Sequence, residues 1–256
     1  MTAHTTSIAA ALCMPTANTP FDQAQHCSLL PIPADFFSGP TMLRGRKEAE
    51  CCENDPAWKQ LLPYVVAMDN VSRIYCYTRG KGGAEGRLHG NISIGLGGHV
   101  DVAPADGESL EALLKSEANR ELAEEANLPP ADIEFVGLIC DPPNTVGQVH
   151  IGLLAVRRIT DEEKAFMLGE DDIVEKGEFV SLNYLMDEAN FSRLENWSKR
   201  AVQYLADGHE CSACQGSGSS PAVARLHPRS GLGPELHRDL NGSETRGAGR
   251  KGLSGH

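Results

Sequence analysis

The apolar residues of this chain occur in short runs of a length typical of β-strands, and turn-forming residues separate the runs. The runs at 64–68 and 72–79 flank the triplet at 69–71 (Asp-Asn-Val), so together they predict a β-hairpin. Four further strands are predicted at 91–96, 133–140, 149–158 and 178–183. Two further helices are predicted at 160–168 and 191–206.

A central helix is predicted at 109–126, because this segment contains neither Pro nor Gly. Glu108 or Ser109 can cap its N-terminus. Asn127 can adopt the left-handed conformation that commonly follows a helix, and the proline pair at 129–130 prevents continuation. Both ends of this helix are therefore marked in the sequence.

These elements indicate an α/β fold, in which a mixed β-sheet lies between helices as an α/β/α sandwich. The folded domain is predicted at 59–207. Residues 1–58, rich in Pro, Ser, Thr and Cys, are expected to form an irregular arm that is ordered around 29–37. The Gly/Ser-rich segment 208–256 buries too little apolar surface to order itself and is expected to be a flexible tail.

Charge restricts the kinds of partner that the chain can bind. The formal net charge is −12, and since the tail is slightly basic, the acidity belongs to the folded part. Non-specific binding to nucleic acid needs an excess of Lys and Arg, so no nucleic-acid partner is expected. A small anionic substrate would need a metal ion or a local basic pocket. Whether the chain is a monomer or a homodimer is left open.

The expected compartment is the cytoplasm. No apolar run reaches the roughly 18 residues of a membrane span. No Lys or Arg precedes Arg44, so the basic region of a secretory signal is missing. The eight cysteines have no regular spacing, which fits free thiols in a reducing compartment.

Four glutamates gather on one side of the central helix. At 100° per residue, Glu117, Glu121, Glu124 and Glu125 share an arc of about 100°. A solvated acidic face is the ordinary interpretation of such a pattern. Most of them lie near the helix C-terminus, however, where the helix dipole and mutual repulsion each cost roughly a few tenths of a kcal/mol. A hard divalent cation would offset both costs, and Arg120 alone compensates locally.

The stretch 120–125 (RELAEE) resembles the R-E-U-x-E-E core of the Nudix box, in which U is an apolar residue. Upstream, 97–101 (GGHVD) is similar to the glycine turn that opens the box, and 107–108 (GE) to its G-E step. Downstream, 177–182 (GEFVSL) is similar to a strand that often follows in this family. The resemblance covers roughly 60–206, and it implies a Nudix-like sandwich.

The box departs from the family spacing. Nine residues separate Gly98 from Glu108 where the family has five, and eleven separate Glu108 from Arg120 where it has seven. Four extra helical residues add about one turn and rotate Glu108 by only about 40°, which leaves Glu108 and Glu111 as alternatives for the first box glutamate. Asn127 replaces the family's glycine, and because Asn tolerates a left-handed exit, the turn should survive.

The resemblance implies a Mg²⁺- or Mn²⁺-dependent hydrolase, in which water attacks a phosphoanhydride of a nucleoside diphosphate derivative. Glu121, Glu124 and Glu125 would then be metal ligands, the Gly98 carbonyl could be another, and Arg120 would orient a carboxylate through a fork-like ion pair. The cation would neutralise phosphate charge that an acidic protein repels.

The resemblance also implies a general base, which would be a box glutamate, such as Glu124 or Glu125, or a carboxylate outside the box. The outside candidates are Glu170, Asp171, Asp172 and Glu178. Glu178 ranks first, because it enters a strand that faces the box in the family pattern. A surface acid is the alternative reading of Glu178.

Histidine and basic residues beside the box are candidates for substrate binding. His99 in the glycine turn could contact phosphate, and Arg79, Lys81 and Arg87 could form a positive pocket. The alternatives are a structural histidine and ordinary surface charges. His150 alternates with apolar neighbours in a strand, so a structural role is expected for it.

The tail contains Cys211 and Cys214 in a C-x-x-C-x-G-x-G motif, which looks like half of the zinc motif of J-domain chaperones. A structural zinc site needs four ligands, and a second copy of the motif is absent, although the pair at 51–52, His209 or another chain could complete it. Free thiols in a flexible tail are favoured, and a redox role lacks the βαβ context.

Two other functions remain as alternatives. A Nudix-like module that binds nucleotides without turnover is one, because the box is stretched. A diphosphate isomerase of the same fold is the other, and it would need Cys76 or Cys140 to reach the metal.

Overall fold

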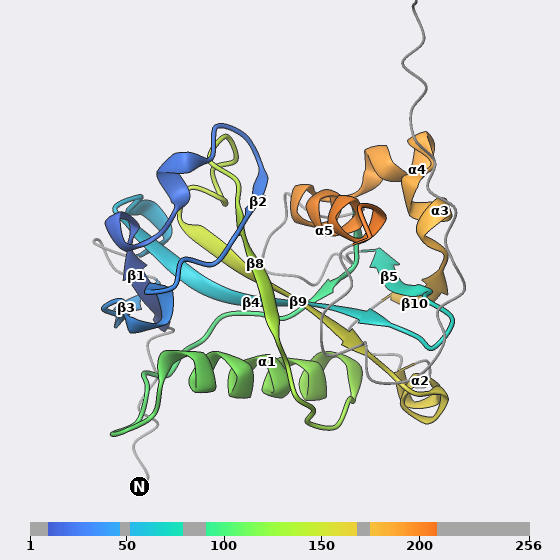
Figure 1. Cartoon of the computed structure of the whole chain (residues 1–256), viewed down its shortest axis with the longest axis horizontal. Coiled ribbons are helices and arrows are strands. Elements are labelled where there is room, and N and C mark those ends of the chain that lie inside the picture. The colour runs from blue at the N-terminus through green and yellow to red at the C-terminus, as the bar shows by residue number, and fades with distance from the viewer. Residues whose placement is uncertain (1–9, 47–51, 79–90, 168–174, 209–256) are drawn as a thin grey trace, which may run out of the picture. The chain divides into compact units, whose positions relative to one another are not determined.

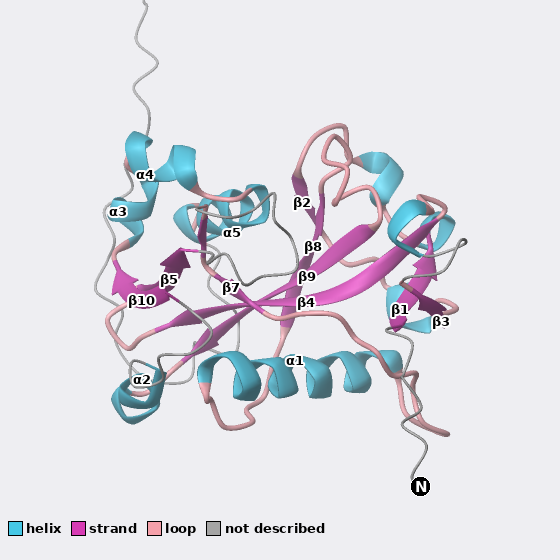
Figure 2. Cartoon of the chain, turned by 180° about the vertical axis from the view of Figure 1, so that it is seen from behind, coloured by secondary structure: helices cyan, strands magenta, loops and turns pink. Residues whose placement is uncertain are grey.

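Ten strands of the described residues join into one mixed sheet (Figures 1 and 2). The computed structural model describes residues 10–46, 52–78, 91–167 and 175–208. The strands are β1 (Ala10–Pro15), β2 (Ser28–Leu30), β3 (Met42–Gly45), β4 (Trp58–Met68), β5 (Ile74–Thr78), β6 (Ile92–Ser93), β7 (Gly95–Leu96), β8 (Phe135–Cys140), β9 (His150–Arg158) and β10 (Glu175–Val180). The helices are α1 (Leu110–Ala126), α2 (Asp161–Met167), α3 (Leu182–Met186), α4 (Glu188–Arg193) and α5 (Asn196–Ala206), with 3₁₀ turns η1 (Thr16–Asn18), η2 (Phe21–Gln23), η3 (Phe36–Ser38) and η4 (Cys52–Asn54).

The longest path through the sheet has the order β10-β5-β4-β9-β8-β2. Strands β4 and β9 pair in parallel over nine residue pairs, from Gln60↔His150 to Met68↔Arg158, whereas the neighbours β5 and β8 run antiparallel to them. The sheet is therefore mixed, as the sequence predicts.

The central strands are buried on both faces. Side chains alternate across a strand, so Val65 and Leu153 pack in the cluster that contains the buried face of α1, while Val66 and Leu154 pack in the cluster that contains α5. Figure 1 shows α1 on one side of β4 and β9, and α5 on the other. This arrangement confirms the predicted sandwich and explains why these strands read as continuous apolar runs.

The predicted hairpin is formed by β4 and β5, which meet at Met68↔Ile74. Its turn closes through the carboxylate of Asp69, which accepts the backbone N–H groups of Val71 and Arg73 at 3.1 and 2.8 Å. Ser72 takes the positive φ of 61° that so tight a reversal requires.

The described part of the N-terminal arm differs from the irregular segment expected at 1–58. Strand β1 pairs with β3 and β4, and β2 pairs with β8, so both belong to the sheet. Their burial accounts for this order, since Leu12 and Met14 are fully buried in the core cluster of α1. Three- to six-residue strands carry too little local periodicity to be recognised, because the partner strand supplies their stability.

Three other boundaries differ from prediction. The strand expected at 91–96 is interrupted into β6 and β7, and the closing helix expected at 191–206 is split at Leu194 into α4 and α5. Strand β10 ends at Val180 rather than 183, because the Ser181 hydroxyl accepts the Tyr184 N–H at 3.2 Å and starts α3.

The five cysteines within the described ranges are free thiols, at positions 13, 27, 52, 76 and 140. Among the described helices, none combines the length and the apolar character needed to cross a membrane. The tail from 209 onward, with Cys211 and Cys214, lies outside the described residues.

Candidate active site

Helix α1 carries the four glutamates, and both of its ends are capped as the sequence predicts. The Ser109 hydroxyl accepts the Ala112 N–H at 3.1 Å. Asn127 adopts the left-handed conformation, with φ 52° and ψ 33°, and its N–H donates to Ala123 O at 3.1 Å. The helix therefore ends directly after the glutamates, and their position relative to the sheet is set by two caps and a buried apolar face.

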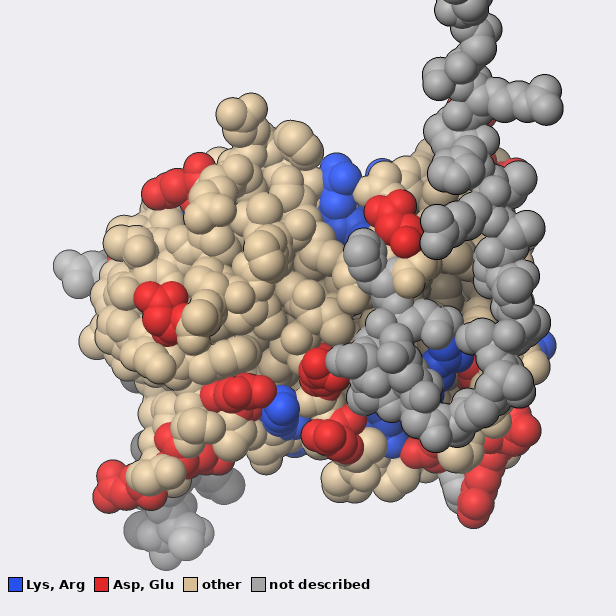
Figure 3. Space-filling view, viewed as in Figure 1, with Lys and Arg blue, Asp and Glu red and all other residues tan. Residues whose placement is uncertain are grey.

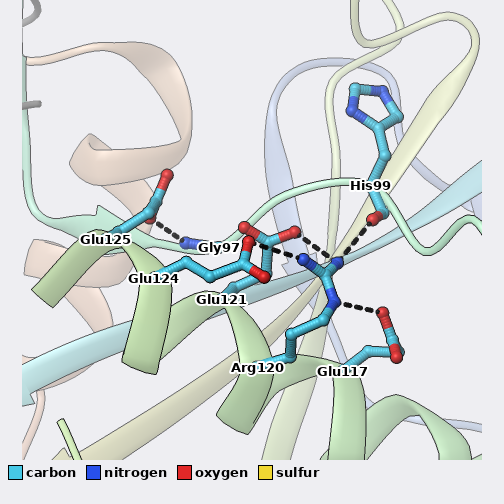
Figure 4. A network of polar contacts seen from close by, with 7 residues as sticks. All are labelled: Gly97, His99, Glu117, Arg120, Glu121, Glu124 and Glu125. Carbon is cyan, nitrogen blue, oxygen red and sulfur yellow. Dashed lines mark hydrogen bonds and ion pairs between the residues drawn. The ribbon is translucent and has the colours of Figure 1, made fainter. Parts of the chain in front are cut away.

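Arg120 is the centre of the polar network at this helix end (Figure 4). Its guanidinium donates from Nε to Glu117 at 2.9 Å, from Nη1 to Glu124 at 2.8 Å and from Nη2 to Glu121 at 2.7 Å. Nη2 also donates to the backbone oxygen of His99 at 3.2 Å. Burial opposes the charge of Arg120, but the bond to Glu117 and the neighbouring carboxylates raise its pKa above the ordinary value. One fork thus ties three carboxylates to the glycine turn.

Two glycines of the turn lie directly against the glutamates. A Cβ atom at Gly98 would be 2.7 Å from Glu121 Oε1 and 2.8 Å from its other carboxylate oxygen, so any other residue here would displace this carboxylate. The Gly97 N–H donates to Glu125 Oε2 at 2.8 Å. The turn and the helix end consequently form one unit in which carboxylates contact the backbone.

The burial of these carboxylates is uneven. The side chains of Glu117 and Glu121 are 11% and 13% exposed, whereas that of Glu124 is 60% exposed. Burial raises the pKa of Glu121, and Arg120 opposes this shift. Three carboxylates bind the one guanidinium, and with the nearby carboxylate of Glu125 they leave a formal excess of three negative charges at the helix end. In Figure 3, acidic side chains gather along the lower edge of the molecule, where α1 lies in the same view.

Two known proteins are similar to the chain. Protein YmaB of Bacillus subtilis (strain 168) is 35% identical over 156 residues, which span 60% of this chain and 74% of YmaB. Tm1382, whose crystal structure is assigned to the Nudix hydrolases, matches with a TM-score of 0.57 and 25% identity and covers 77% of this chain and 98% of its own. No family model matches the sequence. The chain belongs to the Nudix superfamily, in one family with YmaB.

Membership in the Nudix superfamily confirms the resemblance seen at 97–101 and 120–125. The roles of single residues stay predictions. In the described residues, Glu121, Glu124 and Glu125 do not bring one ligand atom each within 4.8 Å of one another. Arg120 binds one oxygen of Glu121 and one of Glu124, and the Gly97 N–H binds one oxygen of Glu125.

Neither candidate for the first box glutamate joins the network of this Nudix protein. Glu108 precedes the helix, and its carboxylate accepts the Ala105 N–H at 2.9 Å. Glu111 pairs with Lys115 at 2.9 Å. The residue that contacts Arg120 from upstream is Glu117, one turn before it. The helical wheel already placed Glu117 on the same arc as the other glutamates, and residues three apart on a helix are neighbours, so Glu117 could have been predicted from the sequence as a candidate partner of Arg120.

His99, a candidate for phosphate binding, points its ring away from the glutamates (Figure 4). Its Nε2 lies 3.2 Å from Nε2 of His150, and His150 Nδ1 lies 2.7 Å from the backbone oxygen of Val146. Burial lowers the pKa of His99 to about 3, and Arg46 and His150 contribute to this shift. The two histidine rings therefore contact each other on the side of the turn away from the glutamates. The structural role predicted for His150 thus involves His99 as its neighbour.

Glu178 is exposed on β10, where it lies opposite Cys76 of β5. Its role as general base stays a prediction. The other acidic candidates, Glu170, Asp171 and Asp172, and the basic ones, Arg79, Lys81 and Arg87, lie outside the described residues.

The two cysteines that an isomerase would need are buried. Cys76 is 5% exposed and Cys140 is 0% exposed. Burial raises the pKa of Cys76 to about 11 and that of Cys140 to about 12. Thiols in such apolar surroundings are poor nucleophiles and metal ligands, which argues against the isomerase alternative.

Proposed function

We propose that this Nudix protein is a hydrolase of a nucleoside diphosphate derivative or a related phosphoanhydride, and that it works with Mg²⁺ or Mn²⁺. The observation that carries the proposal is the convergence of the α1 carboxylates on the glycine turn through Arg120. Family membership supports a hydrolase, and the carboxylates support the metal.

The chemistry of the donor set fits a hard divalent cation, and binding of one ion by all three carboxylates would draw their oxygens closer together than they lie in this structure. The set consists of oxygens alone, it has an excess of negative charge, and it lies at a helix C-terminus, where carboxylates without a cation raise the energy. The space that a Cβ at Gly98 would fill is occupied by the carboxylate of Glu121, which places Glu121 beside the turn. Glu121, Glu124 and Glu125 would hold the ion, with the Gly98 carbonyl as a further candidate.

A bound cation supplies neutralisation of the phosphate charge and activation of water at neutral pH. The hydrolysis itself forms one P–O bond to the water oxygen and breaks the bridging P–O bond, and the water proton passes to a carboxylate. Arg120 positions Glu121 and Glu124 by holding one oxygen of each. The candidates for the carboxylate that takes the proton are the exposed Glu124, the half-buried Glu125 and, outside the box, the exposed Glu178.

The experiment is hydrolysis of a panel of nucleoside diphosphate derivatives by the full chain with Mg²⁺, with Mn²⁺ and with a chelator. Glu124→Gln and Glu125→Gln should each lower kcat/KM about 100-fold or more, since each removes a charge that holds the metal or the proton. The matched control is Glu162→Gln, an exposed glutamate on α2, which should leave kcat/KM unchanged.

Product release that needs no metal, or that survives both box substitutions, would refute the proposed site. Nucleotide binding without any turnover would instead identify the binding-module alternative that the stretched box suggests. A cytoplasmic location remains a prediction from the sequence, and cell fractionation would test it.

A further inference from the structure

Three side chains that could ligate a metal meet behind the glycine turn, apart from the α1 carboxylates. Glu53 comes from η4, His99 follows β7, and His150 begins β9. One ligand atom from each lies within 4.8 Å of the other two, and this is the only such trio among the described residues. Segments distant in sequence thus present two imidazoles and a carboxylate to one point.

The spacing of the two imidazoles matches that of ligands around one ion. Zn²⁺ binds histidine nitrogen at roughly 2.0–2.1 Å in a tetrahedral arrangement, which puts two such nitrogens about 3.3–3.4 Å apart. The Nε2 atoms of His99 and His150 lie 3.2 Å apart. Little movement of either ring is needed for both to face the same cation.

The surroundings orient the ligands as in known metal sites. His150 Nδ1 lies 2.7 Å from the Val146 oxygen, so Nδ1–H donates there, and the unprotonated Nε2 of His150 faces Nε2 of His99. The Arg46 guanidinium donates to Glu53 Oε1 at 2.6 Å, which holds the carboxylate in place beside the histidines. Arg46 is also a competing positive charge, so the affinity should lie below that of a closed four-ligand site.

We propose that Glu53, His99 and His150 form a second metal site, which takes Zn²⁺ or a borderline cation of similar chemistry. Two imidazoles with one carboxylate favour such an ion over Mg²⁺, which prefers oxygen ligands. Three protein ligands leave a fourth position open to water or another ligand.

The site would link the N-terminal segment, the glycine turn and β9. Because the backbone oxygen of His99 accepts a hydrogen bond from Arg120, an ion held by the His99 ring would also fix the turn against the α1 network. This inference does not depend on the proposed hydrolase activity, and its test measures metal binding alone.

The test is a calorimetric titration of the chelator-treated full chain with Zn²⁺, in excess Mg²⁺ so that Mg²⁺ competes for the α1 carboxylates. All proteins carry Cys211→Ser and Cys214→Ser, which removes the thiols of the tail. Glu53→Gln and His150→Gln are the test variants. His26→Gln, an exposed histidine outside the trio, is the matched control.

One equivalent of Zn²⁺ should bind to the parent and to His26→Gln, and the affinity should fall more than about 100-fold in Glu53→Gln and in His150→Gln. Co²⁺ in the same site should give visible absorption without a thiolate charge-transfer band. If buried His150→Gln fails to fold by circular dichroism, Glu53→Gln, whose side chain is 31% exposed, decides the outcome. Absence of stoichiometric Zn²⁺ binding, unchanged affinity in Glu53→Gln, or a thiolate band would each overturn the proposal.

Discussion

Replacing Gly98 by alanine tests whether the position of the Glu121 carboxylate matters for metal binding. The three atoms nearest to the added Cβ all belong to that carboxyl group, at 2.7–2.8 Å. Ordinary contact begins at 3.4 Å, so the carboxylate must move by at least about 0.7 Å. The φ of Gly98 lies outside the left-handed region, and alanine therefore adds no backbone strain.

The displacement should act on the site rather than on the fold. A misplacement of about 1 Å in an active site can cost about 100-fold in rate, equivalent to about 2.7 kcal/mol, so a shift of this size should lower kcat/KM by about 10- to 100-fold. The carboxylate is the movable end of a flexible side chain, so the free energy of unfolding should change by less than about 1 kcal/mol.

The assays are Mn²⁺ affinity by calorimetry, which needs no knowledge of the substrate, and kcat/KM on whichever substrate the panel identifies. Gly39→Ala is the matched control. It is another crowded glycine of ordinary φ (−67°), whose added Cβ would meet the end of Met14 at 3.0 Å, away from the α1 carboxylates. Wild-type Mn²⁺ affinity and activity in a folded Gly98→Ala protein would show that the position of Glu121 is irrelevant to the site.

Two further predictions concern stability. Gly97→Ala should lower the free energy of unfolding by about 3 kcal/mol or more in urea, because Gly97 has φ 142° and its Cβ would lie 2.1 Å from the backbone oxygen of Pro63; a loss below 1 kcal/mol would contradict the geometry of the turn. The native pKa of His99, lowered to about 3 from 6.5, means that between these values the unfolded chain binds a proton that the native state does not. The contribution of neutral His99 to the free energy of unfolding should therefore be fully present above pH 6.5 and should be lost as the pH drops toward 3, by at most about 1.4 kcal/mol per pH unit. Urea titrations at pH 7, 6 and 5 should show that the free energy of unfolding depends less steeply on pH in His99→Gln than in wild type. Equal dependence on pH in the two proteins would exclude His99 as the cause.

Much of the site could be predicted from local sequence. Ser109 and Asn127 mark the two ends of α1, and the 3.6-residue period places its glutamates on one arc. The glycine turn could be recognised from 97–101. The sequence did not reveal which carboxylates Arg120 binds. Several glutamates lie near it on the helix, and its pairing with Glu117, Glu121 and Glu124 is decided only when the fold buries some of these carboxylates and not others.

The sequence by itself determined the elements that depend on near neighbours: helix α1, the β4–β5 hairpin, and the acidic face with its flanking glycines. Only the tertiary structure decided what depends on distant pairing. Strands β1 to β3 became ordered because the sheet offers them partners and buried space, not because their short patterns specify strands. The trio of Glu53, His99 and His150 likewise depends on strand pairing. The 3₁₀ turn η4, which carries Glu53, precedes β4, and β4 pairs in parallel with β9 from Gln60↔His150 onward. The turn that carries His99 follows β7, which is also a partner of β4. Periodicity records which way a side chain faces, whereas the register between strands far apart in the chain decides what it faces.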